Sequence, residues 1–215
     1  MNLAFAAPPI VTVPISGSDK RFPVHRIYCV GRNYAEHVKE MGGEVGRDPP
    51  FFFMKPADAI VLDGRFPYPA MSADVHHEIE LVVALGEGGK IFGHAVGLDM
   101  TRRDLQAAAK KLGRPWDTAK GFDHSAPLSA IVPGVTPLKS GAITLDVNGT
   151  RRQTGDISEM IWSVAEIIAE LRKLYALKAG DLIFTGTPSG VGAVSKGDML
   201  SAAIAEVGTL DVAVV

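Results

Sequence analysis

The chain has a single cysteine, Cys29, among its 215 residues. One cysteine cannot close a disulfide within the chain, so we expect a protein of a reducing compartment, the cytoplasm. The sequence also lacks any run of 18 or more apolar residues, which excludes an ordinary transmembrane helix. Pro8, Pro9 and Pro14 interrupt the apolar N-terminal stretch and no basic residue precedes it, so this stretch is not expected to be a signal peptide.

An excess of charge of one sign is also missing. Lysine and arginine number 22 and aspartate and glutamate 24, a formal net charge of −2. The longest basic clusters are the pairs at 102–103, 110–111 and 151–152, which we interpret as solvated surface. Without a basic stripe, neither nucleic acid nor a membrane is expected as a partner.

Glycine and proline, in contrast, are plentiful, with 23 and 14 residues. This composition favours a protein rich in strands and turns over a helical bundle. Val11, Val13 and Ile15 alternate and predict an edge strand within a loose N-terminal extension, residues 1–20. Residues 21–215 are predicted to form one continuous domain. Short apolar runs predict strands at 26–30, 50–54, 78–85, 95–98, 143–147, 150–153, 181–185 and 199–204, with a two-residue hairpin turn at 148–149.

Three helices are expected, at residues 34–41, at 102–112, and after a capping-box pattern formed by Asp156 and Glu159. Asn33 is the expected cap of the first helix, and Thr101 with Asp104 starts the second. In the third, apolar residues recur at three- and four-residue spacing from Ile161 to Tyr175, which indicates core packing. Many strands with three separated helices favour an α+β fold over alternating βαβ units.

Three carboxylates are candidates for a metal site. Glu78 and Glu80 lie two residues apart at the start of an apolar strand, so they project to one face, and Asp99 lies where a strand gives way to a helix. Three hard oxygen ligands suit Mg²⁺, Mn²⁺ or Ca²⁺, while His76 and His77 leave Zn²⁺ open. The alternatives are an exposed strand end for the glutamates and a helix N-terminal acid for Asp99.

Two further groups have the residue types that catalysis needs. His37 and Glu40 are three apart on a helix, so the carboxylate can orient an imidazole that takes a proton from water. Arg103 and Gln106 share a helical face just beyond Asp99, and Lys120 lies among small and apolar residues; these three could place donors over a substrate. For each group, ordinary solvated surface is the alternative. The glycine-rich loop at 185–192 is no phosphate loop, but its N–H groups could face an anion.

Five segments of the chain, in order and in register, resemble the fumarylacetoacetate hydrolase family. They are the stretch from Cys29 to His37 (CVGRNYAEH), Phe53 to Pro56 (FMKP), His76 to Glu80 (HHEIE), Gly97 to Thr101 (GLDMT) and Gly186 to Gly192 (GTPSGVG). The resemblance extends over roughly residues 21–215.

The resemblance implies a mixed β-roll or β-sandwich, usually a homodimer, that binds one Mg²⁺ or Mn²⁺ per subunit. Glu78, Glu80 and Asp99 correspond to the metal ligands. His37 and Glu40 correspond to the water-activating pair on a short lid helix. Lys120 is implied as a further catalytic residue, and substrate contacts are implied for Arg32, Arg103, Gln106, Gly186 and Thr187. Longer relatives have a fourth metal carboxylate where this chain has Val30, so it resembles the short, single-domain members.

The expected reaction is hydrolysis of the carbon–carbon bond of an acylpyruvate. Residues 22–28 and 49–61 look more like the bacterial fumarylpyruvate hydrolases than like the acylpyruvase and oxaloacetate decarboxylase type. That second type, a 2-hydroxymuconate-type isomerase or decarboxylase, and a metal-binding scaffold without activity remain alternatives. The glycines around the first helix predict that residues 33–48 form a mobile lid that substrate orders.

Overall fold

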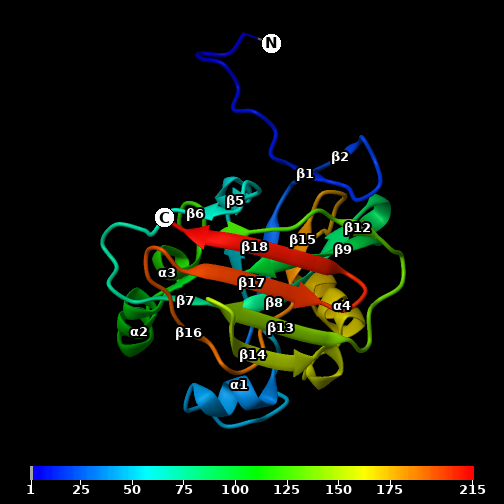
Figure 1. Cartoon of the computed structure of the whole chain (residues 1–215). Helices are drawn as coiled ribbons and strands as arrows, with labels where there is room; N and C mark the ends of the chain where they lie inside the picture. The colour runs from blue at the N-terminus through cyan, green and yellow to red at the C-terminus, as the bar shows by residue number, and fades with distance from the viewer. Residues whose placement is uncertain (1) are drawn as a thin grey trace.

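Two β-sheets packed face to face form the body of the chain in the computed structural model, which describes residues 2–215 (Figure 1). The larger sheet has six strands in the order β12 (Val132–Pro133), β9 (Ile91–Leu98), β8 (Ile79–Leu85), β15 (Leu182–Phe184), β3 (Ile27–Gly31) and β4 (Phe51–Lys55). The smaller has five in the order β14 (Thr150–Asp156), β13 (Ala142–Val147), β17 (Met199–Ile204), β18 (Gly208–Val214) and β6 (Arg65–Phe66).

Short strand pairs and helices lie outside the two large sheets. The minor strands are β1 (Thr12–Pro14) with β2 (Arg21–Pro23), β11 (Ala126–Pro127) with β5 (Ile60–Val61), and β10 (Thr101–Arg102) with β7 (Val75–His77) and β16 (Gly192–Ala193). The helices are α1 (Ala35–Glu40), α2 (Arg103–Leu112), α3 (Asp117–Lys120) and α4 (Val164–Leu174), with 3-10 turns at Ala57–Ala59, Glu87–Gly89 and Ile157–Glu159. The predicted α+β fold with a mixed β-sandwich is confirmed.

Strand β8 is apolar along its whole length because both of its faces are covered. Leu81, Val83 and Leu85 pack between the two large sheets. Val82 and Ala84 point to a second core on the outer face. A strand buried on both faces has no polar side, which explains the continuous run in place of an alternating pattern.

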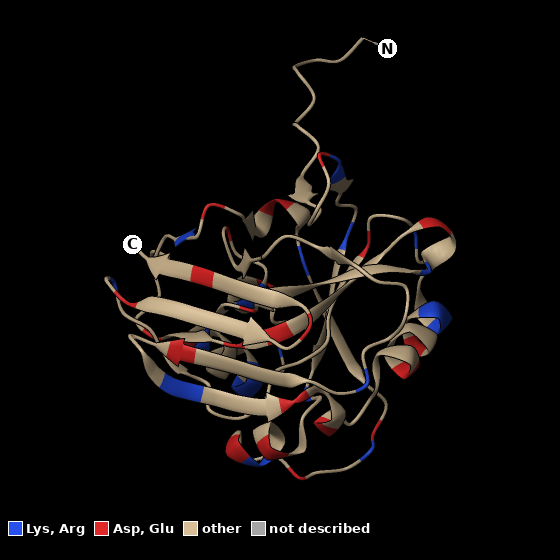
Figure 2. Ribbon diagram, turned by 45° about the vertical axis from the view of Figure 1, so that its right-hand side comes forward, with Lys and Arg blue, Asp and Glu red and all other residues tan. Residues whose placement is uncertain are grey.

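The outer core also receives the β1–β2 hairpin. Val13 is fully buried there, and Ser16 N donates to the carbonyl of Ile131 at 2.8 Å. The boundary at residue 20 stays a prediction, but this contact fixes part of the N-terminal segment to the sandwich. Figure 2 shows basic and acidic residues interspersed over the elements of the fold. No helix within residues 2–215 is long and apolar enough to span a membrane.

The first two helices form where expected, but neither uses the predicted cap. No side chain caps α1, because the amide of Asn33 bonds to Trp162 and to the carbonyl of Thr185. No side chain caps α2 either, because the Thr101 hydroxyl donates to the carbonyl of Asp99. Gly113 ends α2 in the left-handed conformation, with φ of 61°, directly after the expected last residue, 112.

The third helix begins later than predicted. The capping box of Asp156 and Glu159 is present, but it caps the 3-10 turn Ile157–Glu159, after which Met160 is extended. A second box, formed by Ser163 and Glu166, starts α4 at Val164. Two successive N-terminal signals therefore divide the segment into a single turn and a regular helix.

Candidate active site

The three candidate carboxylates meet at one point because of the pairing between β8 and β9. Glu80 lies opposite Gly97 and Ile79 opposite Leu98, so Glu78 comes opposite Asp99, whose N–H donates to the Glu78 carbonyl at 2.8 Å. One oxygen of each carboxylate lies within 4.8 Å of the other two. All three residues are buried, with exposures of 4, 2 and 0% for Glu78, Glu80 and Asp99.

Three cations form ion pairs with two of the three carboxylates. Lys120 Nζ lies 2.7 Å from Glu78 Oε2, 2.6 Å from Asp99 Oδ2 and 2.6 Å from Thr101 Oγ1. Arg103 Nη2 lies 2.5 Å from Glu78 Oε1. Lys55 Nζ lies 2.8 Å from Asp99 Oδ1 in an ion pair outside hydrogen-bond geometry, and it donates to the carbonyl of Lys120.

The carboxylates differ sharply in their electrostatic surroundings. Burial opposes ionisation of Glu78, but the charges of Lys120 and Arg103 outweigh it and lower the pKa of that carboxyl. The pKa of Glu80 is raised well above its usual value, first by burial and then by the negative charges of Asp99 and Glu78. Burial would lower the pKa of Lys120, yet the neighbouring Asp99 and Glu78 raise it, so Lys120 is cationic.

Glu80 is the residue that indicates a metal ion. Its carboxylate accepts a hydrogen bond from Gly186 N at 2.8 Å, and within residues 2–215 it forms no ion pair. A buried carboxylate flanked by two others needs a cation to ionise. Three oxygen ligands without a thiolate or imidazole suit Mg²⁺ or Mn²⁺. His76 and His77 do not join the set, because they bond to Asp74 and Gln153.

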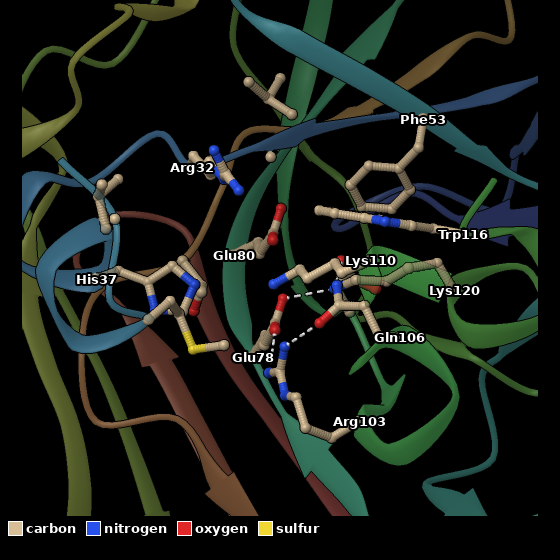
Figure 3. A pocket seen from close by; sticks show the side chains of 17 residues that line it. Arg32, His37, Phe53, Glu78, Glu80, Arg103, Gln106, Lys110, Trp116 and Lys120 are labelled. Atoms are coloured by element: carbon tan, nitrogen blue, oxygen red, sulfur yellow. Dashed lines mark hydrogen bonds and ion pairs between the residues drawn. The ribbon is translucent and has the colours of Figure 1, made fainter. Parts of the chain in front are cut away.

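His37 enters the same pocket from α1 on the opposite wall (Figure 3). The residue is 8% exposed, and its Nδ1 lies 3.1 Å from Glu40 Oε2. Because a carboxylate only accepts, Nδ1 carries the proton in this pair and Nε2 is left as an acceptor. The other oxygen of Glu40 accepts the N–H of Gly190 at 3.0 Å, which ties the helix to the glycine-rich loop.

Arg103 fixes the orientation of the Gln106 amide. Its Nη1 lies 2.6 Å from Gln106 Oε1, and a guanidinium can only donate. The amide nitrogen of Gln106 is therefore turned away from Arg103, and it has no acceptor among residues 2–215. Since Gln106 lines the pocket, this NH₂ group can donate to a bound molecule.

Gln153, which sequence analysis did not single out, orients Thr187 in the same way. Gln153 Oε1 accepts the N–H of Ile79 at 3.1 Å, and Nε2 donates to the carbonyl of Pro188 at 2.9 Å, so the amide has one orientation. Nε2 also donates to Thr187 Oγ1 at 2.8 Å. The Thr187 hydroxyl accepts this bond and keeps its own hydrogen for the pocket that it lines.

The structure thus brings most of the predicted site residues into one pocket. His37, Glu78, Glu80, Asp99, Lys120, Arg32, Arg103, Gln106 and Thr187 line it, and Glu40 supports it through His37. Gly186 does not line the pocket; its N–H bonds to Glu80, and a Cβ on it would lie 2.7 Å from Asn33 Cβ.

Several other residues that line the pocket were not among the site residues predicted from the sequence. Lys110, assigned to solvated surface as part of a basic pair, lines the pocket. Its place four residues after Gln106 is the signal that could have identified it. Trp116 and Phe53 form an aromatic wall, with ring centroids 6.1 Å apart. Cys29 is fully buried, and burial raises the pKa of its thiol well above the usual range.

Comparison with known proteins agrees with this geometry. Residues 26–215 match the family described as fumarylacetoacetate (FAA) hydrolase C-terminal. The chain belongs to the fumarylacetoacetate hydrolase family. The resemblance seen in the five sequence segments is confirmed, and with it the expectation of an enzyme.

Relatives within this family are named for more than one activity. The chain is 42% identical to oxaloacetate tautomerase YcgM of Escherichia coli K12, over 84% of this chain and 88% of that protein. It is 46% identical to a fumarylpyruvate hydrolase of a Ralstonia species, over 70% of this chain and 84% of that protein. A crystal structure of fumarylpyruvate hydrolase from Pseudomonas aeruginosa with Mn²⁺ and pyruvate has a TM-score of 0.96 and 48% identity, covering 100% of this chain and 99% of that one.

Proposed function

We propose that this protein hydrolyses the C3–C4 bond of an acylpyruvate, with 3-fumarylpyruvate as its substrate and fumarate and pyruvate as products. The observation that carries the proposal is the pairing of His37 with Glu40 on the wall that faces the carboxylate triad. A pocket that only bound a metal would not need an oriented base.

The triad defines the inner end of the site. Glu78, Glu80 and Asp99 would hold Mg²⁺ or Mn²⁺. When bound, the ion supplies Lewis acidity that draws electron density toward the 2-oxo end of the substrate. Ion pairs with Lys120 and Lys55 hold Glu78 and Asp99 in place, and the Thr187 hydroxyl donates to the substrate's 1-carboxylate.

His37 supplies the base. With Nδ1–H donated to Glu40, Nε2 accepts a proton from water, and the hydroxide oxygen forms a bond to C4. The Gln106 amide is the best-placed donor to the oxyanion that develops on the C4 carbonyl. All three N–H groups of Lys120 already donate to Glu78, Asp99 and Thr101. Lys120 therefore stabilises the oxyanion through its positive charge and not through a hydrogen bond.

Collapse of the tetrahedral species completes the reaction. The C4–O bond regains its double-bond character, the C3–C4 bond breaks, and its electron pair goes to C3 to give the enolate of pyruvate. The imidazolium of His37 returns the proton to C3. The products are pyruvate and the carboxylic acid of the acyl half, so one water is consumed for each bond cleaved.

Three similarities support fumarylpyruvate as the substrate: the stretches 22–28 and 49–61, the Ralstonia relative, and the Pseudomonas aeruginosa structure with pyruvate. A second candidate is tautomerisation or decarboxylation of oxaloacetate, which is favoured by the names of two tautomerases at 42 and 44% identity and of a decarboxylase at 38%. Either reaction passes through an enol or enolate of the same 2-oxo acid end, but neither needs a hydroxide.

Pyruvate release, coupled to lactate dehydrogenase, tests the proposal. We expect fumarylpyruvate to be turned over with Mg²⁺ or Mn²⁺, much faster than acetylpyruvate or oxaloacetate, and EDTA to stop the reaction. His37→Ala should lower hydrolysis about a hundredfold or more, the usual loss for a general base. Turnover of oxaloacetate alone, unaffected by His37→Ala, would replace hydrolysis with the second candidate. The homodimer implied by the family resemblance stays a prediction, which light scattering measures directly.

A further inference from the structure

Two cations at the mouth of the pocket have no acidic partner. Lys55, Arg103 and Lys120, deeper in, are paired with the triad. Arg32 and Lys110 also line the pocket and are exposed at its rim, but within residues 2–215 neither forms an ion pair. Figure 3 shows their charged ends directed into the cavity from opposite sides.

Lys110 belongs to the same helical face as the inner donors. Arg103, Gln106 and Lys110 stand three and four residues apart on α2, so they follow one another from the triad outward. The Lys110 ammonium lies 5.1 Å from the centroid of the Trp116 ring, which helps to hold it over the pocket. Burial lowers the pKa of Lys110, and the charges of Arg103 and Arg32 lower it further, so positive charge is crowded here.

Arg32 reaches the pocket from a strained backbone. Its φ is 62°, a left-handed value that is unfavourable for a residue with a Cβ. The next residue holds this conformation: Asn33 is buried, its Nδ2 donates to the carbonyls of Trp162 and Thr185, and its Oδ1 accepts the N–H of Trp162. Backbone strain that neighbouring hydrogen bonds hold in place is characteristic of functional positions.

We propose that Arg32 and Lys110 form an anion subsite that binds the far carboxylate of a dicarboxylic acylpyruvate. This inference rests on the proposed function, which places the 2-oxo acid end of the substrate at the triad. An acyl half that ends in a carboxylate provides the missing partner for two cations that the protein leaves unpaired. A purely apolar acyl half would desolvate these cations without compensation.

The first test measures binding, so it does not depend on turnover. The probes are 2-oxoheptanedioate and 2-oxoheptanoate, which have the same chain length and the same 2-oxo acid end but differ in the far carboxylate. Calorimetry on the Mn²⁺-loaded protein should show tighter binding of the diacid by about tenfold or more, as expected for charge-assisted hydrogen bonds. Lys110→Met should remove most of this preference and leave affinity for the monoacid nearly unchanged.

The neighbouring residue offers a matched control. Lys111→Met makes the same change one position along α2, where the side chain does not line the pocket, and should keep the diacid preference. Arg32→Asn removes the charge while retaining a residue type that tolerates positive φ, and should also reduce the preference. Equal affinity of wild type for both probes, or an equal loss of both in Lys110→Met, would overturn the subsite.

Kinetics separate the failure of this inference from failure of the proposed function. In Lys110→Met, kcat/KM for fumarylpyruvate should fall at least tenfold while that for acetylpyruvate, which lacks the far carboxylate, stays nearly constant. Diacid preference in binding without any hydrolysis of fumarylpyruvate would support the subsite and reject the proposed reaction. Hydrolysis that falls equally for both substrates would reject the subsite and leave the reaction standing.

Discussion

Lys55 Nζ lies 2.8 Å from Asp99 Oδ1, and both side chains are buried from solvent. The other oxygen of Asp99 pairs with Lys120, so this carboxylate is held between two ammonium groups. Lys55 comes from β4 at the edge of the six-stranded sheet, whereas Asp99 follows β9. The pair therefore connects two strands that are not neighbours, and one of its members, Asp99, belongs to the candidate metal site.

Lys55→Met should destabilise the metal-free protein strongly. Removing Lys55 leaves Asp99 Oδ1 without its cation, while Lys120 still pairs with Oδ2, so the cost should lie near the lower end of the about 3–5 kcal/mol that is typical of a broken buried ion pair. Mn²⁺ should recover more thermal stability in the variant than in the wild type, because the ion replaces the lost positive charge near Asp99. Thermal unfolding with Mn²⁺ and with EDTA measures both effects.

Lys196→Met is the matched control for this change, because Lys196 is exposed and forms no ion pair within residues 2–215. It should unfold like the wild type under both conditions. If Lys55→Met behaved in the same way, the buried pair would not support Asp99.

Gln153→Met should impair substrate binding through Thr187. Methionine keeps the volume but offers no donor, so the Thr187 hydroxyl loses the partner that fixes its direction. We expect KM to rise about tenfold, the worth of roughly one hydrogen bond, with a smaller change in kcat. The buried groups that Gln153 now satisfies would also lose partners, so the free energy of unfolding should fall by about 1–3 kcal/mol.

Thr187→Val separates the two consequences of that change. It should reproduce the rise in KM with little loss of stability. The double variant should show no further rise in KM beyond Gln153→Met, because both residues act on the same contact. Additive effects on KM would show that Gln153 acts on the site by another route.

His94 should make stability depend on pH in the weakly acidic range. This residue is 5% exposed on β9, and burial lowers the pKa of its imidazole. Below about pH 6.5, the ordinary histidine value, the unfolded chain takes up a proton that folded His94 does not. Stability should therefore fall as the pH decreases through this window. Urea unfolding between pH 5 and 7.5 in EDTA should show a shallower decline for His94→Leu than for the wild type, and an identical decline would exclude His94 as a contributor.

Ligand should protect the segment that contains α1 from trypsin. Arg47, a site for this protease, pairs with Glu166 and lies 4.8 Å from the centroid of the Trp162 ring. His37, Val38 and Met41 of the same segment line the pocket, so a bound molecule touches it directly. Cleavage after Arg47 should be slower with Mn²⁺ and oxalate than with Mn²⁺ alone. Equal rates would contradict the predicted lid.

Local spacing identified the three carboxylates as candidates and predicted the helical faces, while the family resemblance was needed to favour metal ligation over a solvated strand end. Glu78 and Glu80 share a face at the start of β8, and Asp99 directly follows β9. Because β8 pairs with β9, the two short motifs meet once these strands pair. The His37–Glu40 contact needs only one helical turn. Such interactions depend on residues close in sequence or on a single strand pairing.

Contacts between distant segments could not be predicted in this way. Gln153 meets Thr187 only because the two sheets face each other, and Lys55 meets Asp99 only because the sheet places three strands, β8, β15 and β3, between β9 and β4. The start of α4 was misplaced for a different reason. Asp156 and Ser163 both carry a valid capping box, and the extended conformation of Met160 between them decides which one begins the long helix.

The left-handed backbone at Arg32 and the helical position of Lys110 have a consequence for how activity can diversify. Both residues stand outside the paired strands that carry Glu80 and Gly97, and neither contributes to the triad. Under the proposed function, substitutions at these two rim positions should alter which acyl groups are accepted and leave the end of the pocket that carries the triad unchanged. An ancestral scaffold of this kind could supply new substrate ranges through a few point mutations, and directed evolution of the protein should begin at Arg32 and Lys110.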